Sequence, residues 1–254
     1  MKNLFKPTNL PKATAALGII GLVLRRLLYA FGPDSKNLLP NHHPLEILLA
    51  LLSAAALAYI LITVWKLDGS NRYVDNFGPS LPAAVGHVLA AAGILLTVLL
   101  NDPMMPGTLG KLWKVLGFLS APCLIAAGCI RVKGKRPFFV LHLVVCLFLV
   151  FHIVNQYQTW SGNPQLQDYI FTLFGTMALM FFAFYHASFD VGSGRRRMHL
   201  FLGLTALYLC TVNLSMTDHL FLYVGGIAWV LTDLCTLTPK PRPEPKETEG
   251  GKTK

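Results

Sequence analysis

Four of the eight histidines in this chain lie at a similar depth within long apolar segments, and acidic and basic residues flank the same segments. If these segments are helices that cross a membrane, His87, His142, His186 and His199 all fall in the third nearest one boundary. At a rise of 1.5 Å per residue, each histidine lies within roughly 10 Å of that boundary. Imidazole groups gathered at one depth predict a polar vestibule that holds an anionic substrate or a lipid headgroup.

Further polar residues are expected close to the same plane, namely Arg72, Asp75, Asp190, Arg195–Arg197 and Asp233. We therefore expect a ligand-binding site that opens to the cytoplasm. Its candidate residues are His87, His142, His186, Asp190, Arg72 and Arg196. The alternative is that these residues are the ordinary polar ends of helices near a membrane interface and share no site.

The spacing of His186 and Asp190 also permits a catalytic interpretation, because residues i and i+4 share one face of a helix. An intramembrane enzyme that uses this pair as its base is the third-ranked function. No catalytic residue is assigned, because the chain contains no P-loop, GxGxxG or HExxH motif.

No metal ion, haem or other cofactor is expected from the spacing of potential ligands. The chain has no CxxC pair, and all five cysteines lie in apolar segments, where thiols usually act as small hydrophobic residues. His142 and His152 are ten residues apart and point about 80° away from each other on an ideal helix. They are therefore poorly placed to ligate one haem iron.

The elements that must position these residues are apolar helices of membrane length. The 254-residue chain is 54% hydrophobic and only 13% charged, which is too little charge to cover a soluble domain of this size. Continuous apolar runs of about 20 residues are typical of membrane-spanning helices. The predicted fold class is an all-α polytopic bundle of about eight transmembrane helices, at residues 13–31, 45–65, 81–100, 112–130, 138–154, 169–189, 199–215 and 220–237.

The first apolar segment is the weakest of the eight, because Arg25 and Arg26 interrupt it. We expect these arginines to extend to the lipid headgroups, with a phosphate contact as the alternative. The segment itself could instead lie in the membrane interface, which would leave seven spans. Eight spans with both termini inside place 17 of the 22 basic residues on the cytoplasmic side, whereas the seven-span arrangement lowers that number to 14. The positive-inside rule favours eight.

The eight-span topology also predicts the domain boundaries and the cellular location. Residues 1–12 form a cytoplasmic N-terminal segment, residues 13–238 form the transmembrane domain, and residues 239–254 form a disordered cytoplasmic tail in a protein of the cell membrane. We expect residues 70–82 to form a structured inner loop before the third span. Residues 155–169 are expected to form an outer loop rich in amides and aromatic side chains.

The leading function is a non-enzymatic carrier or binder of a small solute or lipid. Its alternative is a membrane subunit or sensor that acts through a protein partner. The middle of every predicted span lacks a carboxylate, which weighs against a proton-coupled transporter. The net charge of +10 is spread over membrane-proximal loops, so the expected partners are the bilayer, a small ligand or a membrane protein, and no nucleic acid.

Overall fold

The computed structural model describes residues 9–32, 43–67, 71–103, 107–160, 169–216 and 219–237, and it folds them into helices. The proposed tail, residues 239–254, and most of the N-terminal segment lie outside these residues. The helices are α1 (Leu10–Phe31), α2 (Pro44–Trp65), α3 (Tyr73–Asn76), α4 (Leu81–Leu100), α5 (Thr108–Val132), α6 (Phe139–Trp160), α7 (Ile170–Val191), α8 (Arg196–Asn213) and α9 (Leu220–Cys235).

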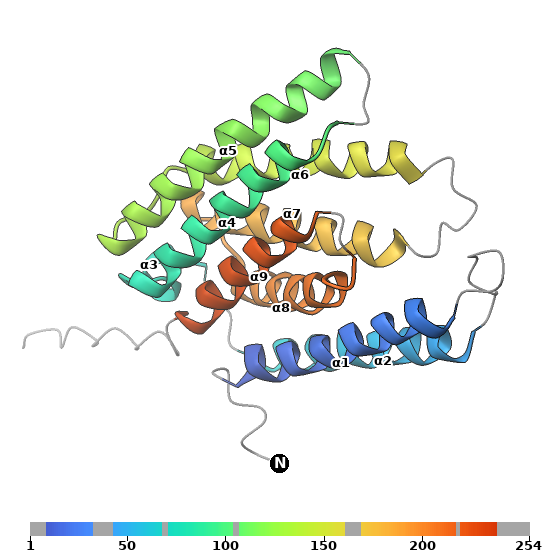
Figure 1. The fold of residues 1–254 in the computed structure, drawn as a ribbon. Helices are drawn as coiled ribbons and strands as arrows, with labels where there is room; N and C mark the ends of the chain where they lie inside the picture. The colour runs from blue at the N-terminus through green and yellow to red at the C-terminus, as the bar shows by residue number, and fades with distance from the viewer. Residues whose placement is uncertain are drawn as a thin grey trace, which may run out of the picture.

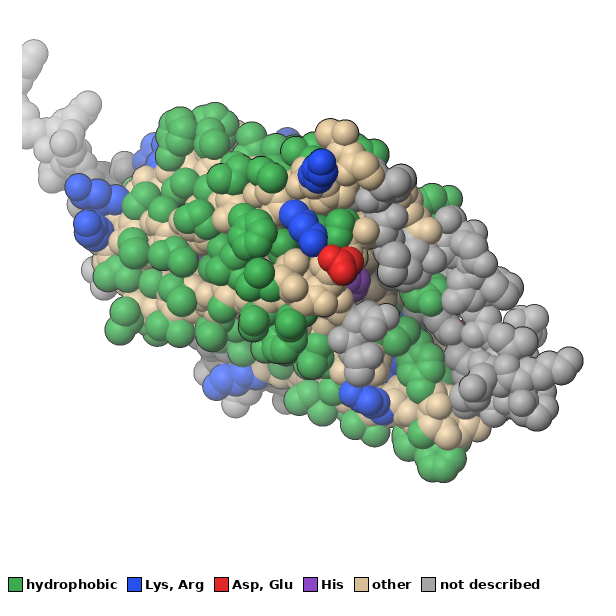
Figure 2. Space-filling model, turned by 45° about the horizontal axis from the view of Figure 1, so that its top comes forward, with side chains coloured by type: hydrophobic (Ala, Val, Ile, Leu, Met, Phe, Trp, Pro, Cys, Tyr) green, Lys and Arg blue, Asp and Glu red, His purple; other side chains and the backbone are tan. Residues whose placement is uncertain are grey.

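Six of these helices, α1, α2 and α4 to α7, are long and apolar enough to cross a membrane. This confirms the prediction of a helical, multi-pass membrane bundle. The other two long helices are less clear candidates, because α8 is rich in polar residues and α9 has only 16 residues. Figure 2 shows a broad hydrophobic surface on one flank of the molecule, with the few charged side chains lying towards its ends.

The helices α4 to α9 form a closed ring in which each helix packs against the next, and α9 packs back against α4. The hairpin of α1 and α2 lies beside this ring and contacts it mainly through α8 (Figure 1). Successive helices run in opposite directions, so α4, α6 and α8 begin at the same end of the ring at which α5, α7 and α9 finish. We call this end, which carries the basic connections 133–138 and 192–195, the basic end.

Small residues allow the closest contact in the ring, between α4 and α9. A Cβ atom added to Gly93 would lie 2.4 Å from the carbonyl oxygen of Phe221, and one added to Gly225 would lie 2.9 Å from the carbonyl oxygen of Leu89. These neighbours are backbone atoms that cannot rotate away. Glycine at both positions therefore permits the two backbones to touch, as small residues commonly do between helices in lipid.

The first helix differs from expectation in the position of Arg25. Its side chain does not extend towards the membrane surface, because it is 1% exposed and its Nη1 donates a hydrogen bond to Asn213 Oδ1 at the end of α8. The guanidinium also lies 5.1 Å from the ring centroid of Phe171. The prediction of two headgroup-seeking arginines was therefore wrong for Arg25, since its charge is used to attach α1 to the ring.

The boundaries of the expected loops also shift. α6 continues to Trp160, so Asn155 and Gln156 are buried helical residues and not part of an outer loop. Gln156 Nε2 donates to the hydroxyl of Tyr223 across the ring, at 3.4 Å. A buried amide with a partner on another helix accounts for this longer helix. Residues 161–168 lie outside the described part of the chain.

Residues 71–80 are structured, as we expected of this segment. Within it, α3 lies across the basic end, and the side chain of Ser80 caps α4 by accepting a hydrogen bond from the backbone N–H of Ala83 at 3.2 Å. Phe77 forms an isolated antiparallel bridge with Leu237, just after α9. These contacts fix α3 over the interior of the ring.

Candidate functional site

A cluster of titratable side chains fills the interior of the ring at its basic end, and all six ring helices contribute to it. We call it the histidine cluster; its members are His87 from α4, Arg131 from α5, His142 from α6, His186 and Asp190 from α7, His199 from α8 and Asp233 from α9. None of them is more than 4% exposed. Such a concentration of buried charged and titratable groups is costly in a membrane protein, which makes the histidine cluster the candidate functional site.

Two carboxylates organise the histidine cluster. Asp190 Oδ2 accepts a hydrogen bond of 2.7 Å from His142 Nδ1. Asp233 is approached by three groups: Arg131 Nη2 lies 3.2 Å from Oδ1, while the Nε2 atoms of His186 and His199 lie 3.2 and 3.4 Å from Oδ2. Two carboxylates thus face one guanidinium, which leaves one net negative charge when the histidines are neutral.

The imidazole rings pack against one another and against aromatic side chains. His142 and His186 stack with their centroids 4.2 Å apart, and His87 lies 5.9 Å from each of them. Trp229 of α9 lies 5.4 Å from His87 and forms one wall of the group. The rings of His142 and His186 are therefore in direct contact, with His87 beside them.

Several polar atoms of the histidine cluster have no hydrogen-bond partner within the described part of the chain. They are Arg131 Nε and Nη1, His142 Nε2, Asp190 Oδ1, both ring nitrogens of His186 and of His199, and both carboxylate oxygens of Asp233, which lie only at ion-pair distances from Arg131, His186 and His199. Buried polar atoms are satisfied in the great majority of cases, because leaving one unpaired costs about 1–3 kcal/mol. A concentration of unpaired atoms in one place therefore indicates a binding site for a further group.

Aromatic side chains close the histidine cluster at the basic end. Phe77, which is 2% exposed, stacks on His186 at 4.9 Å and contacts Phe189 at 5.1 Å. The guanidinium carbon of Arg131 lies 4.4 Å from the centroid of the same ring. Burial raises the pKa of the neighbouring Tyr73 to about 12, so its hydroxyl stays protonated. In place of the expected open vestibule, the histidine cluster is covered by Phe77 in this conformation.

Four of the six candidate residues, His87, His142, His186 and Asp190, come together in the histidine cluster. Arg72 and Arg196 do not. Arg72 is an exposed residue at the N-terminus of α3. Arg196 lines a separate groove of about 610 Å³ between α2 and α8, together with Trp65 and Arg197.

The expected pairing of His186 with Asp190 is also replaced. The two residues share a helix face, as their spacing predicted, but each interacts with a residue from another helix. Asp190 accepts from His142 of α6, and His186 lies against Asp233 of α9. This geometry removes the reason for treating His186 and Asp190 as one acid–base pair.

Sequence reasoning gave Arg131 no part in the site and left Asp233 outside the candidate residues. Arg131 follows an apolar segment and precedes a basic connection, so its charge was attributed to topology. α5 in fact extends beyond Ile130, and Arg131 shares a buried face with Ala127 and Gly128. Small residues three and four positions before a charge on the same helix face were the available signal.

A second polar group lies towards the opposite end of the ring. Trp113 Nε1 donates to His152 Nδ1 at 3.3 Å, and His152 contacts His219 with ring centroids 4.7 Å apart. Between this end and the histidine cluster lies an apolar layer, which surrounds a small cavity lined by Ala90, Ile94, Val145, Leu149, Leu179, Leu222, Gly226 and Trp229. The two polar groups are therefore separated within the ring.

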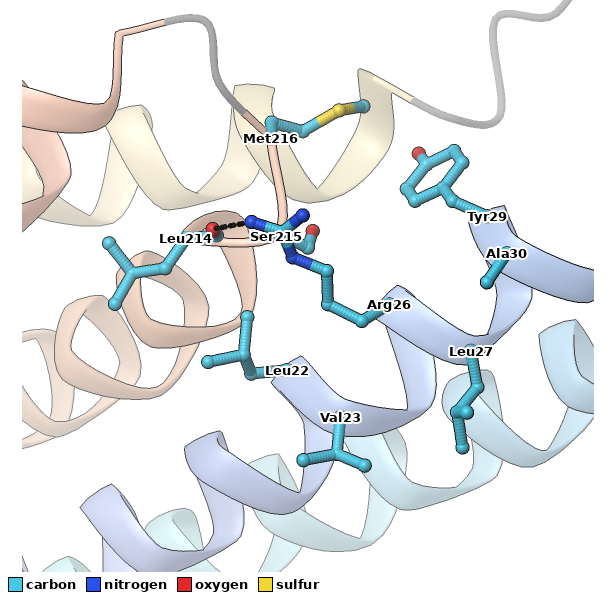
Figure 3. A pocket seen from close by; sticks show the side chains of 9 residues that line it. All are labelled: Leu22, Val23, Arg26, Leu27, Tyr29, Ala30, Leu214, Ser215 and Met216. Carbon is cyan, nitrogen blue, oxygen red and sulfur yellow. Dashed lines mark hydrogen bonds between the residues drawn. The ribbon is translucent and has the colours of Figure 1, made fainter.

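A further groove lies outside the ring, between α1 and the residues that follow α8. It has a volume of about 730 Å³ and a mostly apolar lining, and Arg26 Nη2 donates to the carbonyl oxygen of Leu214 at 3.3 Å within it (Figure 3). This arrangement leaves open the phosphate contact expected as an alternative for Arg26. The groove shares no lining residue with the histidine cluster.

The histidine cluster also contains a group of three potential metal ligands, His87, His142 and His186, with one ring nitrogen of each within 4.8 Å of those of the other two. The expectation of no metal site was based on spacing along the chain. That spacing could not reveal ligands brought together from α4, α6 and α7. Comparisons with family models, curated proteins and solved structures gave no match, so the geometry of the histidine cluster carries the functional argument.

Proposed function

We propose that the chain crosses the cell membrane eight times, with both termini and the basic end on the cytoplasmic side. The closed ring supports this arrangement, since α8 and α9 lie between helices that are candidate spans. The polar residues of α8 face its neighbours and are largely buried, so lipid does not have to solvate them. The excess of Lys and Arg in the basic connections sets the orientation.

Within this arrangement, the proposed function is that of a non-enzymatic carrier or binder that takes a small solute into the histidine cluster. The single observation that supports it is the set of buried polar atoms without partners, which belong to helices on all sides of one closed space. The net negative charge of the histidine cluster favours a cation or a hydrogen-bond donor over an anion. A lipid headgroup with an anionic phosphate, considered from the sequence, is disfavoured by the same net charge.

The route of entry follows from what covers the histidine cluster on each side. Towards the cytoplasm it is covered by α3, a helix of four residues with Phe77 at its end. Towards the other side it is covered by the apolar layer, whose residues belong to long, tightly packed helices. A solute therefore enters by displacement of α3, and passage across the membrane would require the apolar layer to open as well.

Native mass spectrometry of the protein, extracted into lipid nanodiscs without detergent, tests this function. We expect a stoichiometric small adduct on the wild-type chain and its loss from His142→Ala. His152→Ala is the matched control, because His152 is an equally buried histidine of the same helix that lies outside the histidine cluster. Its spectrum should retain the adduct.

The alternative function, a membrane subunit or sensor, predicts a different spectrum. A stoichiometric protein partner without any small adduct would favour it, and the carrier proposal would then be abandoned. An adduct that is unaffected by His142→Ala would also contradict the proposal, because the ligand would bind outside the histidine cluster.

A further inference from the structure

The hydrogen bonds of His87 and His142, and the ion-pair contact of His186, indicate which ring nitrogen of each histidine carries a proton. His87 Nδ1 donates to the carbonyl oxygen of Ala83 at 2.8 Å, and His142 Nδ1 donates to Asp190 Oδ2 at 2.7 Å. His186 Nε2 lies 3.2 Å from Asp233 Oδ2. Carbonyl and carboxylate oxygens only accept hydrogen bonds, so each of these nitrogens bears the hydrogen in a neutral ring.

The opposite nitrogen of each ring therefore carries a lone pair. These atoms are Nε2 of His87, Nε2 of His142 and Nδ1 of His186. The last two have no hydrogen-bond donor within the described residues. Lone pairs gathered in one buried space require a proton, a donor or a metal ion between them.

From this arrangement we infer that His87, His142 and His186 form a binding site for a divalent first-row transition-metal ion of the Zn²⁺ type. The inference rests on the proposed function and names the class of solute. Three neutral imidazoles with a fourth position open are a recognised ligand set for such ions, and imidazole is poorly suited to Mg²⁺ or Ca²⁺.

The distances fit this assignment after a small movement. Metal–nitrogen bonds of about 2.0–2.1 Å in a tetrahedral site place two ligand nitrogens about 3.4 Å apart. One ring nitrogen of each histidine already lies within 4.8 Å of the other two. Metal binding would therefore draw the nitrogens together by at most about 1.4 Å.

The surroundings of the three rings are those of a metal site as well. Ligating histidines almost always donate their second nitrogen to a carboxylate or a backbone carbonyl, which orients the ring and increases its basicity. Ala83 and Asp190 accept such hydrogen bonds here, and Asp233 Oδ2 lies 3.2 Å from His186 Nε2. The net negative charge of the histidine cluster favours a dication, and the unpaired Asp190 Oδ1 is available to a water on the open position.

Zinc titration of the full chain in nanodiscs, after removal of metal with a chelator, tests the inference. Isothermal calorimetry with Zn²⁺ alone should give one site per chain. Co²⁺ in its place should give the visible absorption of a tetrahedral nitrogen-ligated ion. His142→Ala and His186→Ala should weaken Zn²⁺ binding by at least about 100-fold, and Asp190→Asn by about 10- to 100-fold.

Two controls keep the result interpretable. His152→Ala should bind Zn²⁺ as the wild type does, which separates this site from metal bound at the other end of the ring. His142→Gln preserves a polar side chain of similar size in case His142→Ala does not fold. For each variant, the rise in Tm on adding Zn²⁺, several degrees in the wild type, reports binding independently of calorimetry.

The outcomes separate the inference from the proposed function. If the wild type does not bind Zn²⁺, the metal site is overturned. The same holds if both His142 variants bind Zn²⁺ as tightly as the wild type. If an organic adduct that depends on His142 is nevertheless seen in the native mass spectrum, the carrier proposal stands with a different solute. If neither metal nor adduct binds, the histidine cluster holds water only and both proposals fail.

Discussion

Among single residues, Arg131 carries the only positive charge that is fixed within the histidine cluster. It lies 3.2 Å from Asp233, and its Nη2 donates to Thr236 Oγ1 at 3.3 Å. Both side chains of this ion pair are at most 1% exposed. A buried ion pair contributes little net stability, but loss of one partner leaves an uncompensated charge.

We therefore predict that Arg131→Met lowers the free energy of unfolding by about 3–5 kcal/mol, because it leaves Asp233 as a buried carboxylate without its cation. Thermal unfolding in nanodiscs measures the change. The double variant Arg131→Met/Asp233→Leu should recover most of the loss, since both charges are then removed. A double variant that is less stable than Arg131→Met would show that Asp233 is not held by Arg131.

At the level of secondary-structure elements, the short helix α3 determines access to the histidine cluster. Tyr73 and Phe77, the residue that follows the helix, are buried against the ring, while Val74 is 81% exposed. A helix of four residues makes few hydrogen bonds of its own, so side-chain contacts hold it in place. Local opening of such an element needs less free energy than unfolding of the bundle.

We predict that Phe77→Ala makes the histidines reactive from the cytoplasmic side. Removal of the ring uncovers His186 and His199, which Phe77 contacts at 4.9 and 5.6 Å. Modification with diethyl pyrocarbonate, mapped by peptide mass spectrometry, should remain at background for both histidines in the wild type and rise at least about tenfold in the variant. Val74→Ala is the control on the same helix, and an equal rise there would contradict the role of Phe77.

The crossing of α4 and α9 brings His87 and Asp233 into the same space, and it depends on close backbone contact. We predict that Gly93→Leu destabilises the protein by about 1–3 kcal/mol or more, because a side chain cannot fit against the carbonyl of Phe221. Ala92→Leu adds a similar side chain at the neighbouring exposed position and should be close to neutral. Comparing the Tm values of the two variants in nanodiscs tests this contact. A similar fall in Tm in both variants would contradict it.

Hydropathy predicted the long helices because each apolar run must satisfy its own backbone in lipid. It was less accurate at ends where a polar residue is buried by a partner. α6 continues past Val154 because Gln156 has Tyr223 as its partner, and α5 continues past Ile130 because Arg131 has Asp233. Such partners lie far away in sequence, so no local pattern reveals them.

For the molecule as a whole, the membrane topology is the property on which the route of entry depends. We predict that Lys12→Cys and Ser193→Cys react with a membrane-impermeant maleimide only from the cytoplasmic side, and Thr108→Cys only from the other side, in a variant without native cysteines. This pattern follows from eight spans and the positive-inside rule. Reaction of Lys12→Cys from the outside would instead support seven spans, with α1 in the interface.

The depth of the histidines could be predicted from the sequence, whereas their partners could not. Counting residues along each apolar run placed His87, His142 and His186 at one level of the membrane. Which of them meet depends on helix rotation and on the order of the ring, which the contacts among α4 to α9 determine. The closure by Phe77 was equally hidden, because nothing in residues 71–80 indicates which side chain faces inwards.

The central claim, that the histidine cluster holds a small ligand, is tested most directly by a crystal structure of the wild-type protein grown from lipidic mesophase. The protein should be purified without chelators, so that a bound ligand is retained. We predict a compact electron-density feature among the unprotonated nitrogens of His87, His142 and His186. If those three rings contact one another with no density between them, the claim is contradicted.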